Sequence, residues 1–196
     1  MRGKLGLLGG TFDPPHNGHL RVAQDARQAL GLDLVLLIPV RVPPHKRADR
    51  VTPAALRLEM VREAIAGTDR LEVSEIELGR EGPSYTVDTL RRLRDQRPDV
   101  ELTLIVGADQ LAEMADWKEP EEISALAGLA VMNRGALVPV EPDWDITLEW
   151  TAVSVTPLDV SSTEIRRRVA EGRPVGHLVP AEVLRIIERE KLYCNG

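Results

Sequence analysis

Residues 6–20, GLLGGTFDPPHNGHL, join an apolar run to a segment of helical pattern through a loop rich in glycine, proline and histidine. We predict a buried strand over Leu5–Leu8, a sharp turn at Gly9 and Gly10, and a helix over His19–Leu30. A strand that turns directly into a helix is typical of a parallel sheet whose strands are connected by crossover helices.

The remainder of the chain repeats this alternation. Further strands are predicted at Leu34–Pro39, Leu71–Ile76, Leu102–Val106, Leu129–Met132 and Ala152–Val155. Helices are predicted at Pro53–Ala66, Val87–Gln96, Asp109–Met114 with Glu119–Ala127, Ser162–Glu171 and Ala181–Glu190. The pattern predicts an α/β fold, a Rossmann-like doubly wound parallel sheet with helices on both faces. We expect one domain over residues 1–196, with a helical C-terminal portion over about 162–193.

Composition narrows the class of protein. The chain has 196 residues, of which 43% are hydrophobic and 29% charged, and its net charge of −6 disfavours a nucleic-acid binder. It contains no apolar run long enough to cross a bilayer and no signal-peptide pattern, so we expect a cytoplasmic protein without a membrane partner. Cys194 is the only cysteine, which excludes an intramolecular disulfide and a cysteine-based metal cluster.

Two helix starts carry capping signals. Thr52 before Pro53 has the pattern of an N-cap followed by a proline in the first turn. Ser161 and Glu164 have the spacing of a capping box, which predicts the start of the next-to-last helix.

The loop after the first strand has the features of an anion site. In parallel α/β sheets, ligands bind beyond the carboxyl ends of the strands, and the first loop is a favoured place for phosphate. Gly9 and Gly10 allow close approach of a ligand, and the helix start offers free N–H groups. His16 and His19, three residues apart, can project to one side, with Gly18 between them leaving room, and can stabilise charge on phosphorus.

Other interpretations of the histidines stay open at this point. His16 could be a solvated loop residue and His19 a residue at the helix start, without a role in binding. A zinc site is disfavoured, because only His45, His177 and Cys194 could supply further ligands. The loop is neither a Walker A motif nor a dinucleotide fingerprint.

The combination GGTFDPPHNGH resembles the signature of the nucleotidylyltransferase superfamily, whose members transfer a nucleotidyl group, usually from ATP. The segment VSSTEIRRR, residues 160–168, resembles the second superfamily motif, with valine in place of isoleucine. The resemblance implies that His16 and His19 are catalytic and that ATP binds at both motifs and at the fourth strand. The implied ATP-binding residues are Gly9, Gly10, Thr11, Phe12, His16, Gly18, His19, Gly107, Asp109, Ser162, Thr163 and Arg166.

The middle of the chain resembles bacterial nicotinate-nucleotide adenylyltransferases in its segments PPHK, SYTVDTL, GADQL and ADWKEPEEI. The implied acceptor residues are His45, Lys46, Thr86, Trp117 and Lys118. Trp117 offers a flat face for a pyridine ring, and Thr86 could donate to the nicotinate carboxylate. Core filling by Trp117, a mobile basic loop at Lys46, and simple capping roles for Thr86 and Asp109 remain open alternatives.

Two departures from this family pattern stand out. Lys118 occupies the position where the family commonly has tyrosine, and Asn133–Gly135 replaces an Arg-Pro-Gly segment. A contact made by that arginine is therefore in doubt.

The implied reaction is transfer of AMP from ATP, with Mg²⁺, to nicotinate mononucleotide, giving nicotinate adenine dinucleotide and pyrophosphate in NAD synthesis. Alternatives are an adenylyltransferase for another acceptor, such as nicotinamide mononucleotide, and a non-catalytic nucleotide-binding regulatory protein. No dedicated metal site of the protein is expected, and an assembly of identical subunits is compatible with the sequence.

Overall fold

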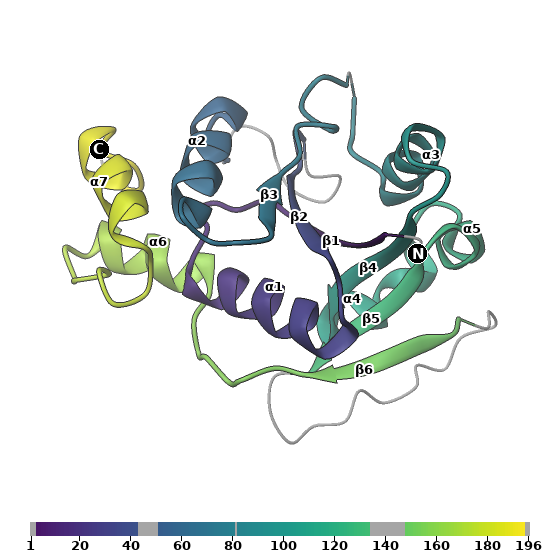
Figure 1. Cartoon of the computed structure of the whole chain (residues 1–196). Helices are drawn as coiled ribbons and strands as arrows, with labels where there is room; N and C mark the ends of the chain where they lie inside the picture. Colours follow the sequence, from purple (N-terminus) through teal and green to yellow (C-terminus); the bar gives the residue numbers. More distant parts are fainter. Residues whose placement is uncertain (1–2, 43–50, 81, 134–147, 195–196) are drawn as a thin grey trace.

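Six parallel strands form one sheet that is covered by helices on both faces (Figure 1). The computed structural model describes residues 3–42, 51–80, 82–133 and 148–194. The strand order is β3-β2-β1-β4-β5-β6, and every neighbouring pair is parallel. This is the doubly wound order in which the direction of winding reverses between the first and fourth strands. The predicted fold class is confirmed.

The helices and strands follow the predicted alternation closely. The strands are β1 (Lys4–Gly10), β2 (Leu34–Pro39), β3 (Leu71–Val73), β4 (Glu101–Gly107), β5 (Gly128–Asn133) and β6 (Trp150–Ser154). The helices are α1 (Asn17–Leu30), α2 (Ala54–Ile65), α3 (Thr86–Gln96), α4 (Ala108–Ala112), α5 (Pro120–Leu126), α6 (Ser162–Ala170) and α7 (Ala181–Arg189). A short 3₁₀ turn, η2 (Met114–Asp116), lies between α4 and α5.

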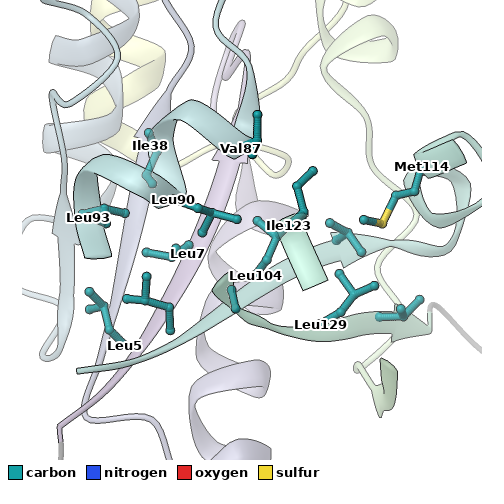
Figure 2. Close-up of a cluster of buried hydrophobic side chains, with 14 of the residues drawn as sticks. Leu5, Leu7, Ile38, Val87, Leu90, Leu93, Leu104, Met114, Ile123 and Leu129 are labelled. Carbon is teal, nitrogen blue, oxygen red and sulfur yellow. The ribbon is translucent and has the colours of Figure 1, made fainter. Parts of the chain in front are cut away.

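The two faces of the sheet are buried in separate apolar clusters. Because successive side chains of a strand point to opposite faces, Leu7 belongs to one cluster and Leu8 to the other. Helices α3 and α5 cover the first face, and Figure 2 shows Leu90 and Ile123 among the strand leucines there. Helices α1 and α2 cover the second face.

A third cluster joins the C-terminal helices to the outer side of α2. Met60 and Ala64 of α2 pack with Ile165 of α6 and with Val183 and Ile187 of α7. This contact places α6 and α7 beside α2, at the edge of the molecule (Figure 1). The chain end is thereby brought near the loop that follows β1.

The end of β3 and the N-cap of α2 differ from the sequence-based expectations. The strand predicted to end at Ile76 ends at Val73, because the chain then forms a turn in which the Leu78 N–H donates to the Glu75 carbonyl. Pro53, and not Thr52, is the N-cap of α2. Ser161 does cap α6, since its Oγ accepts from the Glu164 N–H at 3.2 Å. Within the described residues, no helix is both long and apolar enough to span a membrane.

Candidate active site

The loop after β1 is held in a tight backbone path. Phe12 has a left-handed backbone with φ of 50°, and its side chain is buried at 1% exposure. Its ring lies under Gly10, where an added Cβ would come within 3.0 Å of Phe12 Cζ. Gly9 has open space above it, so a ligand could approach the backbone there.

The two histidines meet at the start of α1. His16 is the N-cap residue and His19 is the third residue of the helix. Their rings stack with centroids 3.7 Å apart, and the edge of Phe12 supports His19 with centroids 4.9 Å apart. The His16 backbone N–H donates to His19 Nδ1 at 3.2 Å. A neutral His19 ring that accepts at Nδ1 carries its proton on Nε2, so its outer nitrogen is a hydrogen-bond donor.

Gly18 is explained by packing within the protein. A Cβ on this residue would lie 2.9 Å from Val160 Cγ1 and 3.0 Å from the His16 ring. The glycine therefore allows α1 to sit against the segment that precedes α6. The expectation that Gly18 also leaves room for a ligand stays a prediction.

The start of α6 is bound directly to the loop after β1, although the two motifs are far apart in sequence. Ser162 Oγ donates to the Pro14 carbonyl at 2.9 Å, and Arg166 Nη1 donates to the Asp13 carbonyl at 2.7 Å. Arg166 also donates to Thr163 Oγ1 at 3.2 Å. The fold thus brings both predicted phosphate-binding motifs to one place.

A pocket of about 550 Å³ opens where the sheet winding reverses, beyond the carboxyl ends of β1 and β4. Residues from the first loop, from the starts of α3 and α4, and from the η2–α5 segment line it together. The predicted residues among its walls are Gly9, Gly10, Thr11, His19, Thr86, Gly107, Asp109, Trp117 and Lys118.

The other predicted site residues lie beside the pocket or outside the described part of the chain. Phe12, His16 and Gly18 are buried behind the loop, and Ser162, Thr163 and Arg166 lie at the start of α6. His45 and Lys46 fall outside the described residues, as do Arg134 and Gly135.

The end of β4 is shaped for a polar contact. The Gly107 N–H donates to Gln110 Oε1 at 3.1 Å. A Cβ on Gly107 would clash with Asp109 Oδ1, the end of a flexible side chain, so a larger residue there would displace the Asp109 carboxylate from the strand end. Gly107 is the N-cap of α4, and Asp109 is its exposed second residue rather than the cap.

The opposite end of the pocket combines an aromatic side chain with a helix start. Trp117 is partly buried against the first apolar cluster and also lines the pocket, so it fills the core and presents a surface at once. Thr86 is the first residue of α3, where backbone N–H groups have no partner within the helix. Tyr85 is the N-cap, and it makes no side-chain capping bond.

Lys118 is held beside this helix start by Asp88. Its Nζ lies 3.1 Å from Asp88 Oδ1 and 5.1 Å from the centre of the Tyr85 ring. Arg80 donates to the same carboxylate at 3.0 Å. Partial burial acts to raise the pKa of Asp88, but the hydrogen bonds from Lys118 and Arg80 outweigh it, and the net pKa is lowered.

Glu77 is a buried carboxyl in the wall of this end. It is 5% exposed, and its Oε1 accepts from Thr89 Oγ1 at 2.7 Å. No described group hydrogen-bonds its Oε2. Burial raises the pKa of Glu77, against smaller opposing effects of Thr89, Ser84 and Arg80. No pattern in the sequence had indicated Glu77 as a site residue.

Arg57 was also missed, although the sequence contains a signal for it. This guanidinium is 1% exposed and donates to the carbonyls of Thr11 at 2.7 Å, Thr52 at 2.9 Å and Arg41 at 3.1 Å. It precedes Val61 by one helical turn, on the buried stripe of α2. An arginine at a core position of an amphipathic helix could have been recognised as a buried structural cation.

Known proteins resemble this chain over most of its length. A family model described as "Cytidylyltransferase-like" matches residues 7–168. A protein of Exiguobacterium sibiricum named "Probable nicotinate-nucleotide adenylyltransferase" is 43% identical over 192 residues, which cover 98% of this chain and 100% of the relative. A protein of Thermus thermophilus with the same name is 44% identical over 190 residues, covering 97% and 99%.

A solved structure has the same fold. The Plasmodium falciparum nicotinic acid mononucleotide adenylyltransferase, complexed with NaAD, matches with a TM-score of 0.80 over 97% of both chains. Its sequence identity to this chain is 16%, so the likeness concerns the fold.

Proposed function

The chain belongs to the nicotinate-nucleotide adenylyltransferases, and we propose that its pocket transfers AMP from ATP to nicotinate mononucleotide in NAD biosynthesis. The products are nicotinate adenine dinucleotide and pyrophosphate. The observation that carries the proposal is the continuous pocket from the glycine-rich loop and His19 to Thr86 and Trp117. Two ligands placed at its two ends would meet at the carboxyl ends of β1 and β4.

The ATP end would be formed by the first loop, by the end of β4 and by α6. Gly9, Gly10 and Thr11 offer backbone for the phosphates, and Gly107 with Asp109 would hold the ribose. The start of α6 adds further donors. There, Ser162, Thr163 and Arg166 would face the triphosphate, with Arg166 holding the leaving pyrophosphate.

The acceptor end would bind the pyridine ring and its carboxylate. Trp117 would stack on the ring, and the N–H groups at the start of α3, with Thr86, would donate to the carboxylate. Lys118 adds positive charge at this end although Asp88 shares it. His45 and Lys46 are retained as candidates for contacts to the acceptor phosphate.

The chemistry needs no covalent intermediate with the protein. An oxygen of the acceptor's 5′-phosphate, whose second pKa is about 6, attacks the α-phosphorus of ATP. A new phosphorus–oxygen bond forms while the bond to the bridging oxygen of the leaving pyrophosphate breaks in line. Catalysis therefore consists of positioning and charge stabilisation.

The histidines would supply that stabilisation. His19 lines the pocket and presents Nε2–H as a donor to the oxygens of the α-phosphate. His16 stacks behind it and fixes its ring through the backbone hydrogen bond. His16 would thus act on the α-phosphate from a buried position, by holding the His19 ring.

We propose that Mg²⁺ enters with ATP as part of the substrate. Among the described residues, no three His, Cys, Asp or Glu side chains are grouped as a metal site. The ion supplies neutralisation of the phosphate charge. We propose the cytoplasm as the location of the protein, because both substrates are small soluble nucleotides.

Position-labelled ATP tests the reaction type. With ATP labelled at the α-phosphorus and nicotinate mononucleotide, label should appear in the dinucleotide, whereas label at the γ-phosphorus should appear in pyrophosphate. Transfer of the γ-label to the acceptor, or no transfer of either label, would refute adenylyl transfer.

A further inference from the structure

Tyr193 lies at the end of the chain but contacts the loop after β1. Its hydroxyl donates to Asp13 Oδ1 at 2.6 Å. Asp13 is 4% exposed, and its other carboxylate oxygen accepts from the Thr52 N–H at 3.2 Å. The proposed reaction gives Asp13 no chemical task, so this contact requires another explanation.

Two residues near this position, Lys191 and Tyr193, have a left-handed backbone conformation. After α7 the Leu192 N–H donates to the Ile187 carbonyl at 2.9 Å. Lys191 has φ of 50° and Tyr193 has φ of 64°, a region that residues with side chains seldom adopt. Such conformations persist where the surroundings determine them, and they often accompany functional sites.

Charged groups surround the hydroxyl–carboxylate pair. Burial and the nearby Asp13 charge raise the pKa of Tyr193, so the phenol keeps its proton and acts as donor. The Arg57 guanidinium faces the pair, and Arg166 donates to the Asp13 carbonyl at 2.7 Å. The pair is thus a partly buried, charge-assisted hydrogen bond.

We propose that Tyr193 is a positioning residue for adenylyl transfer: its bond to Asp13 ties the C-terminal segment to residues 11–16 and fixes the His16–His19 pair. The inference rests on the proposed function for its effect on rate. It goes beyond that function because it assigns the chain end a part in building the phosphate site. Loosening the tie should shift the loop by a fraction of an ångström, which is enough to slow a positioned reaction.

The attachment of α7 itself does not depend on this bond. Val183 and Ile187 pack against Met60 of α2, and Arg189 pairs with Glu59 at 2.8 Å. Arg189→Gln therefore provides a matched control, because it removes an exposed contact of the same helix without touching the loop.

The test compares Tyr193→Phe with Arg189→Gln in the full chain. We expect Tyr193→Phe to lower kcat about tenfold while the KM for nicotinate mononucleotide stays within twofold. Hydrogen exchange of peptides covering Thr11–His16, measured without substrates, should become faster. Arg189→Gln should change neither. Wild-type kcat and wild-type loop exchange in Tyr193→Phe, with only a lower melting temperature, would overturn the proposal.

A second variant tests the pair as a unit and replaces Tyr193→Phe if that protein does not fold. Asp13→Asn keeps the size of the side chain but removes the charge, so kcat should fall and loop exchange should rise. The double variant should lose no more kcat than the worse single variant; multiplied losses would contradict the pairing. Exchange needs no turnover, so it judges the tie even if wild-type protein proves inactive, a result that would refute the proposed function alone.

Discussion

His19 is the proposed catalytic side chain whose position the surrounding contacts fix most clearly. It is held by Phe12 on one side and by His16 on the other, and its Nδ1 is occupied by a backbone donor. Nε2 is the other ring nitrogen, and His19 lines the pocket. The proposed role of His19 therefore depends on its Nε2–H group.

Removing that group should slow the reaction without unfolding the protein. His19→Ala is expected to lower kcat by about 100- to 1,000-fold, the usual loss for a donor to transition-state charge. His19→Gln, whose amide can place an N–H near the position of Nε2, should retain more activity than alanine. Steady-state kinetics and melting temperatures measured side by side check this. Equal activity of wild type and His19→Ala would remove the proposed role.

Glu77 gives a prediction about the pH dependence of stability. Its pKa is raised in the folded state, so the folded protein binds this proton more tightly than the unfolded chain. Stability should therefore fall as pH rises from the unfolded value, near 4.5, through the raised folded value, with no such loss below 4.5.

The substitution Glu77→Gln removes this proton uptake. Relative to wild type, the variant should become progressively more stable as the pH rises above 4.5, as judged by urea denaturation. Glu72→Gln, at an exposed position on β3, serves as the control. A stability difference between Glu77→Gln and wild type that stays constant with pH would contradict the assignment.

At the scale of elements, two neighbouring serines of α6 have separate tasks. Ser161 caps the helix through the Glu164 N–H, whereas Ser162 reaches across to the Pro14 carbonyl. The first bond belongs to the helix alone. The second joins the helix to the phosphate loop.

These tasks can be separated by a matched pair of alanine variants. Ser161→Ala should lower the free energy of unfolding by about 1 kcal/mol and leave the KM for ATP unchanged. Ser162→Ala should raise the KM for ATP severalfold with a smaller effect on stability. Denaturation curves and ATP titrations distinguish them. A raised KM in Ser161→Ala without one in Ser162→Ala would reverse the assignment.

At the scale of the whole molecule, the sheet and its helices could be predicted because most strands are short apolar runs. Strands buried on both faces, such as β2 over Leu34–Pro39, stand out from helices of mixed pattern. A doubly wound parallel sheet binds its ligands beyond the carboxyl ends of its strands, and the observed strand order places the loop after β1 beside the end of β4. The general place of the pocket was therefore predictable.

Contacts between distant segments were not predictable, because nothing local encodes them. Thr52 has the pattern of an N-cap, yet its N–H donates to Asp13, and the helix begins after Pro53 instead. Tyr193 carries no periodic signal, since it follows the last helix. A contact with Asp13 overrode the capping preference of Thr52. Another contact with Asp13 gives Tyr193 its proposed role.

Pyrophosphate release from ATP and Mg²⁺, with nicotinate mononucleotide or nicotinamide mononucleotide supplied at equal concentration, tests the proposed acceptor most directly. In the proposed acceptor site, the N–H donors at the start of α3 and Lys118 would favour an anionic ring substituent, because an amide would leave polar groups unpaired. We predict that kcat/KM is at least about tenfold higher for nicotinate mononucleotide. Equal values, or a preference for the nicotinamide compound, would contradict it.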